Sequence, residues 1–471
     1  MFLPILSAIL GIIAFLPVNF YPLGFVWLAP LFIFFLKEKS FWRLVLGAVL
    51  FRLLFSLGTV YFTLEPILWV SSLLIFLGLP IAIFILKRGL ARAFHSLFIA
   101  QYSLLFSLPF LWTFFDHLQA RYSLAPIYIA TAGNAFGSSP FVGLAGLGGL
   151  LFLTFFAALI NALITGIVVN SGSGKNKINL AITAFIFILL FSGWQISNSE
   201  LHKNSIAYNN LKNSIKIAVV STNEKFNYGQ LERLKKELSS QPVDFIIFPE
   251  DIFNDPPFGN LSTPIFQNLA KELNTNIVAA YDTLQGDKNK LKYNSAILFD
   301  NRGNVVGVHN KNRLTFVGEY WPFGNWRPPL TDWLKKRNPE IKNYAIFDPK
   351  NSDYRGERNL LTAAFQKNSA LFASPICLEV HYPADLKEYK KSGAKFIVNP
   401  TSNRWVSIGL NHFLYLANNL KKIETVWLNL PIISSGVRDF AGIILPDNQT
   451  RLIDYQAGGK NYRVFIGEIK Y

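Results

Sequence analysis

Three reactive residues each stand at the end of a run rich in Ile, Val, Leu and Phe. They are Glu250, Lys311 and the single cysteine of the chain, Cys377. A carboxylate can take the proton of a thiol, an ammonium can stabilise an oxyanion, and a thiolate can attack an acyl carbon to give a thioester. If the fold brings these three side chains together, they form a site for acyl chemistry.

Each of the three residues alone has a simpler explanation. A lone cysteine after an apolar strand is more often a small buried hydrophobic residue than a nucleophile. A Glu at a strand end is usually solvated or a cap, and a lone Lys in a polar loop usually lies on the surface. The catalytic hypothesis therefore depends on their meeting in one pocket.

The pattern around these residues predicts an α/β domain over residues 215–471. Short β-rich runs alternate with helical stretches, which is typical of layered α/β domains. Functional side chains in such folds gather where the strands end. The expected strands are 215–221, 244–248, 276–280, 293–299, 305–310, 370–376 and 396–399, and the expected helices are 228–239, 264–273 and 383–392.

The first two hundred residues have a different character. They hold only ten of the 45 Lys and Arg and four of the 29 Asp and Glu. A membrane span needs roughly 20 apolar residues, so residues 1–198 are predicted to form a polytopic helical bundle of about seven spans. The expected spans are 1–18, 25–36, 42–64, 67–86, 97–115, 140–169 and 180–196, and a polar linker is expected at 199–214.

The charges of the short loops predict an orientation. Alternate loops carry basic clusters, namely Lys37, Lys39 and Arg43, then Lys87, Arg88 and Arg92, then Lys175 and Lys177. Lys and Arg near span ends accumulate on the cytoplasmic side. We therefore expect a multi-pass protein of the cell inner (cytoplasmic) membrane, with its N-terminus inside and its α/β domain on the periplasmic side.

Composition argues against other classes of function. The net charge of +16 is not concentrated in basic blocks interleaved with aromatic residues, so nucleic acid is not an expected partner. One cysteine allows no intramolecular disulfide. The sequence shows neither a metal-ligand cluster nor a phosphate-binding Gly-rich motif, so no cofactor or metal is expected.

Four motifs, in order, resemble the Glu, Lys and Cys blocks of the nitrilase (carbon-nitrogen hydrolase) superfamily. They are Phe248–Glu250, Tyr293–Ser295, Asn310–Pro322 and Ile376–Glu379. The third motif, with its Lys followed by Gly-Glu-Tyr and a Pro, is similar to the branch called apolipoprotein N-acyltransferase. That branch also carries an N-terminal membrane bundle, so the resemblance spans nearly the whole chain.

The resemblance implies a four-layer α-β-β-α catalytic domain and a role in lipoprotein maturation. An acyl chain would pass from a phospholipid, through a cysteine thioester, to the α-amine of diacylglyceryl-cysteine in an apolipoprotein. Glu250 would be the proton acceptor, Lys311 the oxyanion stabiliser and Cys377 the nucleophile. Glu319 and Glu379 match supporting acidic positions. The expected partners are phospholipid, the diacylated acceptor and membrane lipid, and the expected state is a monomer.

Five further residues are predicted to contact substrate or to form lids: Phe226, Tyr320, Trp321, Trp326 and Leu378. The segments Asp255–Gly259 and Tyr320–Trp326 place aromatic residues beside two of the catalytic blocks, and Trp and Tyr favour the membrane interface. Ordinary packing of these loops explains their aromatic content equally well.

Two other functions use the same residues. A membrane-anchored nitrilase-type amidase would pass the acyl group to water. A non-catalytic membrane binding protein would keep the nitrilase scaffold without its reaction. Because the amidase shares the three reactive residues, the sequence alone does not dismiss it. Retention of all three argues against the non-catalytic protein.

Overall fold

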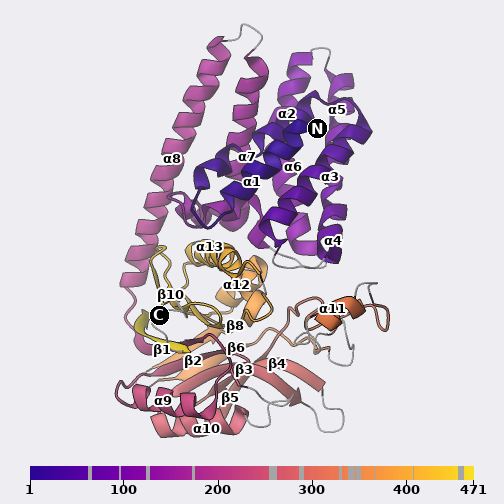
Figure 1. Cartoon of the computed structure of the whole chain (residues 1–471). Coiled ribbons are helices and arrows are strands. Elements are labelled where there is room, and N and C mark those ends of the chain that lie inside the picture. The colour runs from indigo at the N-terminus through magenta and orange to yellow at the C-terminus, as the bar shows by residue number, and fades with distance from the viewer. Residues whose placement is uncertain are drawn as a thin grey trace. The chain divides into compact units, whose positions relative to one another are not determined.

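The computed structural model of the chain divides into two compact units (Figure 1). One comprises Met1–Ser205 and Val406–Asn429, and the other comprises Ile206–Trp405 and Leu430–Tyr471. The structure describes residues 1–61, 66–94, 97–123, 128–171, 176–253, 262–285, 291–327, 331–337, 345, 352–365, 368–406, 408–453 and 461–471. The expected lid segment Asp255–Gly259 lies outside the described residues.

The first unit is helical, as its composition predicts. Within the described residues, four helical stretches are long and apolar enough to cross a membrane: Phe41–Thr59, Val70–Ala93, Val142–Asn170 and Asn176–Asn209. Two shorter apolar ones are Phe2–Ala14 and Tyr21–Lys37. The α-helices of this unit are α1 (Phe2–Ala14), α2 (Ala29–Lys37), α3 (Phe41–Thr59), α4 (Pro66–Phe76), α5 (Gly78–Ala93), α6 (Leu97–Tyr122), α7 (Ala145–Asn170), most of α8 (Asn176–Asn209), and α13 (Leu410–Leu428).

Two boundaries differ from the sequence expectation. The segment expected as a linker, 199–214, is helical as far as Asn209, because it contains no Gly or Pro and Lys203 pairs with Glu200 at 2.6 Å. Helix α13 belongs to the helical unit although it lies within the stretch assigned to the α/β domain. It is held there by polar contacts, including the bond from Asn134 Nδ2 to the Leu416 carbonyl (3.0 Å).

In the described residues of the second unit, twelve strands form one mixed sheet, whose main path runs β5-β4-β3-β2-β1-β9-β8-β7-β6. Strand β12 pairs with β1, and β10 pairs with β9 and β11. The strands are β1 (Ser214–Thr222), β2 (Phe245–Glu250), β3 (Asn276–Gln285), β4 (Leu291–Phe299), β5 (Val305–Asn310), β6 (Leu360–Ala364), β7 (Ser369–Ala373), β8 (Ile397–Ser402), β9 (Ile432–Val437), β10 (Ala441–Ile444), β11 (Thr450–Ile453) and β12 (Tyr462–Lys470). Its α-helices are α9 (Tyr228–Ser239), α10 (Ser262–Leu273), α11 (Thr331–Arg337) and α12 (Pro383–Lys391).

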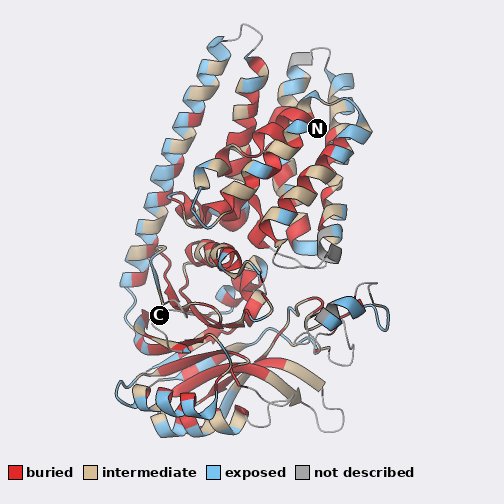
Figure 2. Ribbon diagram, in the orientation of Figure 1, coloured by how far each residue is buried: buried red, intermediate tan, exposed pale blue. Residues whose placement is uncertain are grey.

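The two faces of β1 show how this sheet is covered. Successive side chains of a strand point to opposite faces, so Ala218 and Val220 pack with α9 and α10, whereas Ile217 and Val219 join the core between the two halves of the sheet. Figure 2 shows the resulting buried layers along the sheet. The terminal strands of the path, β5 and β6, approach each other, with Leu361 against Gly307, so the sheet is nearly closed. The expected nitrilase-type fold class is confirmed.

Local sequence signals explain several elements around the site. Asn227 begins α9 with a capping box, in which its side chain accepts from the Gln230 N–H (3.0 Å) and the Gln230 side-chain oxygen accepts from the Asn227 N–H (2.8 Å). The β4–β5 turn depends on Asp300, whose carboxylate accepts two backbone N–H groups, and on Gly303 at φ 82°. The turn pairs β4 with β5, and Lys311 directly follows β5.

Candidate active site

Cys377 lies in a sharp turn between β7 and the 3-10 helix Cys377–His381. Its φ is 52°, a left-handed conformation that costs a non-glycine residue about 1–3 kcal/mol and that surrounding contacts must hold. Asn399 supplies such contacts, since its Nδ2 donates to the carbonyls of Pro375 (2.9 Å) and Cys377 (3.1 Å). The thiol itself is buried beside Ala280 and Ala296.

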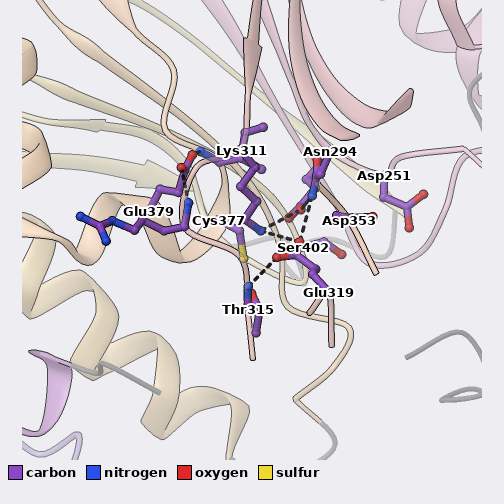
Figure 3. A network of polar contacts seen from close by, with 12 residues as sticks. Asp251, Asn294, Lys311, Thr315, Glu319, Asp353, Cys377, Glu379 and Ser402 are labelled. Atoms are coloured by element: carbon purple, nitrogen blue, oxygen red, sulfur yellow. Dashed lines mark hydrogen bonds and ion pairs between the residues drawn. The ribbon is translucent and has the colours of Figure 1, made fainter. Parts of the chain in front are cut away.

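Glu250 and Lys311 meet at one end of the sheet. Glu250 is the last residue of β2, and Lys311 directly follows β5. The Lys311 ammonium lies 2.6 Å from Glu319 and 3.6 Å from Glu250. Asn294 on β4 donates to both carboxylates, at 2.6 Å to Glu250 and 3.0 Å to Glu319. The Cys377 sulfur lies near this ammonium and interacts with it electrostatically (Figure 3).

Burial and charge set the protonation of this cluster. Burial raises the pKa of Glu250, against the pull of Lys311. Burial also raises the pKa of the Cys377 thiol to about 12, with a further contribution from Glu250. Desolvation alone would lower the pKa of Lys311, but Glu319 and Glu250 raise it well above its usual range. The resting thiol is therefore protonated, beside a carboxylate that can hold its proton and a fixed positive charge.

Glu319 is held differently from Glu250. It accepts from the Thr315 N–H (2.7 Å) as well as from Lys311, and Lys311 lowers its pKa although burial would raise it. It therefore remains ionised and fixes the direction of the ammonium. The supporting role of Glu319 in catalysis stays a prediction.

Glu379 lies in the 3-10 helix that begins at Cys377, and its side chain contacts the segment around Lys311. Its carboxylate accepts four N–H groups: Ile376 (2.8 Å) before the nucleophile, Asn312 (2.7 Å) and Arg313 (3.0 Å) after Lys311, and His309 Nε2 (3.1 Å) on β5. The Asn359 N–H donates to His309 Nδ1 (3.4 Å), so Nε2 carries the proton that faces Glu379. The carboxylate thus fixes the Cys377 turn against the Lys311 loop.

Comparison with known proteins identifies the architecture. One family model, the apolipoprotein N-acyltransferase N-terminal domain, matches residues 7–163, and a second, carbon-nitrogen hydrolase, matches residues 213–425. The apolipoprotein N-acyltransferase of Haemophilus influenzae is 22% identical over 468 residues, covering 91% of this chain and 81% of that protein. The chain belongs to the apolipoprotein N-acyltransferase family.

Two other known proteins match about half of this chain. The apolipoprotein N-acyltransferase of Aquifex aeolicus is 28% identical over 240 residues, covering 50% of this chain and 48% of that protein. A nitrilase-superfamily structure, Nit3 of Saccharomyces cerevisiae, aligns with 55% of this chain and 91% of its own, at 14% identity and a TM-score of 0.40.

The residues predicted to contact substrate in this N-acyltransferase family member fall in three environments. Trp326 is 53% exposed and stacks on the buried Trp321, whose Nε1 donates to the Trp326 carbonyl (2.8 Å). The adjoining Tyr320 lies beneath the Arg355 guanidinium. Phe226 is buried between Phe253 and Tyr462 in the core beneath α9. Leu378 packs beside Cys377. The substrate contacts of all five residues stay predictions.

Sequence reasoning missed several residues that organise this acyltransferase site. Asn294 lies in the Tyr-Asn-Ser motif but was given no role, and His309 precedes Lys311 by two positions. Asn399 and Thr401, which hydrogen bonds to the thiol, lie on β8. Position in the motifs was the available signal for Asn294 and His309, but their partners come from distant parts of the chain.

Proposed function

We propose that this member of the family transfers an acyl chain from a phospholipid to the α-amine of diacylglyceryl-cysteine in lipoproteins, with Glu250, Lys311 and Cys377 as its catalytic residues. The observation that carries the proposal is the convergence of a buried thiol, a buried carboxylate and a buried ammonium in a chain that also matches the N-acyltransferase N-terminal domain. Membrane helices and lipid substrates suit each other, because the donor resides in the bilayer.

In the first half-reaction, Glu250 accepts the Cys377 proton as the sulfur bonds to the ester carbonyl of the phospholipid. Lys311 stabilises the oxyanion that forms, and the backbone N–H of Leu378 is a second donor for it. Collapse breaks the C–O ester bond and leaves the acyl group on sulfur. The departing alkoxide of the lysophospholipid takes the proton from Glu250.

In the second half-reaction, the acceptor amine attacks the thioester and loses a proton to Glu250. The C–S bond breaks, the new C–N amide bond is complete, and the proton returns to the sulfur. Because the same oxyanion develops in both halves, Lys311 serves both. A buried thioester is also shielded from water, which favours transfer over hydrolysis.

We further propose that the protein lies in the cytoplasmic membrane with its catalytic unit outside. The basic loops between alternate apolar runs support this orientation. Alkaline phosphatase fused after Tyr471 should be active, because this reporter folds only outside the cytoplasm. An inactive fusion, with an active one placed after Ala93 at the end of α5, would reverse the proposed orientation.

Intact-protein mass spectrometry tests the reaction. The purified enzyme is incubated with phospholipid, with and without a diacylated lipopeptide that has a free α-amine. We expect an acyl adduct on Cys377 that disappears as the lipopeptide gains an amide-linked chain. An adduct discharged only to free fatty acid would instead indicate the amidase, and an unreactive Cys377 would indicate a binding protein.

A further inference from the structure

The segment Asp353–Asn359, which connects to β6, contacts the catalytic blocks through its backbone. The Asp353 N–H donates to the Glu319 carbonyl (2.8 Å), and the Gly356 N–H donates to the Lys311 carbonyl (2.9 Å). The side chain of Asn312, the residue after Lys311, donates from Nδ2 to the Gly356 carbonyl (3.0 Å). The segment therefore bonds directly to both members of the Lys311–Glu319 ion pair.

The approach of this segment to the Lys311 loop is close. A Cβ at Gly356 would lie 2.3 Å from the carbonyl oxygen of Asn310, so no larger residue fits without moving the backbone. At the far end, the Asn359 N–H donates to His309, and Arg358 pairs with Asp385 at 3.0 Å. The segment is thus fixed along its length.

The near end is fixed by an ion pair that the proposed mechanism does not use. Lys292 on β4 lies 2.9 Å from Asp353 and 3.1 Å from Asp282 on β3. Its own carbonyl accepts the Tyr354 N–H (2.8 Å). The Asp353 side chain is only 2% exposed, so its contact with Lys292 is shielded from solvent. Lys292 stands two residues before Asn294, which binds Glu250 and Glu319.

We propose that Asp353–Asn359 is a strap that positions Lys311 and Glu319 for acyl transfer, and that the Lys292–Asp353 ion pair anchors it. Asp353 is then a positioning residue, which acts through the backbone of Glu319 and does not touch the substrate. The proposal rests on the role of Lys311 in the proposed function. Small displacements of an oxyanion donor slow a reaction about 10-fold to 100-fold, and this is the expected effect of losing the anchor.

The anchor also predicts a dependence on pH. The charged groups that face Asp353 are Lys292 on β4, Asp282 on β3 and Glu319 in the loop after β5. Burial, with help from Asp282, raises the pKa of Asp353 to about 7, so the charged pair forms only above that pH. Thioester formation, which does not need the acceptor amine, should rise through pH 7 more in the wild type than in Asp353→Asn, where Glu250 alone of these two carboxylates still ionises.

The test measures thioester formation and amine transfer separately, in the full-length enzyme. Asp353→Asn should slow both half-reactions to the same extent, with the KM for the lipopeptide nearly unchanged. Lys292→Met should do the same, and the double variant should be no slower than either single one. Lys292→Arg should recover part of the rate. Glu357→Gln, the same chemical change at an exposed position of the strap, is the matched control and should react at the wild-type rate.

Wild-type rates in Asp353→Asn would overturn the strap, and so would a defect confined to amine transfer, which would place Asp353 at the acceptor. Thermal unfolding in detergent should show that Asp353→Asn remains folded. If this variant does not fold, the rate of Lys292→Arg and the pH profile of the wild type test the strap instead. The failure of the proposed function looks different. It would appear as the absence of any Cys377 adduct in the wild type, whereas an adduct that forms equally fast in Asp353→Asn contradicts only the strap.

Discussion

Glu250 and Glu379 are two buried glutamates near the Cys377 turn, and their surroundings shift their pKa values in opposite directions. Glu250 receives one amide hydrogen bond and lies 3.6 Å from Lys311, and burial raises its pKa. Glu379 receives four N–H groups, and these donors lower its pKa although burial alone would raise it. The number of donors thus distinguishes a carboxylate that can accept a proton from one that remains an anion and holds loops together.

Replacing the proposed nucleophile should have the largest effect on the reaction. Cys377→Ser should lower transfer at least about 10³-fold, because a serine hydroxyl lacks the nucleophilicity of a thiolate and retains its proton. The measurement is amide-linked acylation of the lipopeptide, with membrane insertion and thermal unfolding as controls. Full activity in this variant would refute the thioester mechanism.

Glu250→Gln should remove the base but leave the turn intact. We expect thioester formation to slow about 10²-fold to 10⁴-fold, the usual contribution of a general base. Stopped incubations with phospholipid followed by mass spectrometry give the rate. A normal burst of acyl-enzyme would show that another group takes the thiol proton.

Glu379→Gln should have the opposite profile, affecting stability more than chemistry. Its new amide N–H₂ would face backbone donors, and each unsatisfied buried group costs about 1–3 kcal/mol. The free energy of unfolding in detergent should therefore fall more in Glu379→Gln than in Glu250→Gln. Equal losses in the free energy of unfolding would show that Glu379 holds the fold no more than Glu250 does.

The smallest effect concerns the pH dependence of stability. The pKa of Glu379 is lower in the folded than in the unfolded chain, where it is about 4.3. Its contribution is therefore fully present above that value and is lost as the pH falls through the folded pKa. Wild type and Glu379→Gln should converge in melting temperature on acidification from pH 6, and parallel curves would contradict this assignment.

The sequence predicted the elements that depend on local pattern. Buried runs such as the one that ends at Glu250 gave strands close to their observed bounds, because a short apolar run between polar turns has few alternatives. Residue type and order along the chain pointed to Glu250, Lys311 and Cys377. Their convergence needed the fold, as did the partners of Asn294 and His309.

Other features depend on contacts that a local pattern does not contain. Strands β6, β9, β10, β11 and β12 were not predicted. Two of them, β6 and β12, are defined by pairing with β7 and β1. Helix α13 was not expected, although its amphipathic pattern was available, and its place in the helical unit follows from bonds such as Asn134 to Leu416. The proposed role of Asp353 depends on its contact with Lys292, which is far away in sequence. It therefore could not be predicted from the local pattern.

The pairing of β1 with β12 has a consequence for biosynthesis. Ser214 lies opposite Lys470, so a central strand of the catalytic unit receives one of its neighbours only from near residue 470. During synthesis, β1 follows α8 and must remain without that neighbour while the intervening chain is made. Pairings between such distant segments close slowly. The enzyme should therefore acquire its active form late, when synthesis of the chain is nearly complete, and a nascent chain halted before β12 should remain open to proteases.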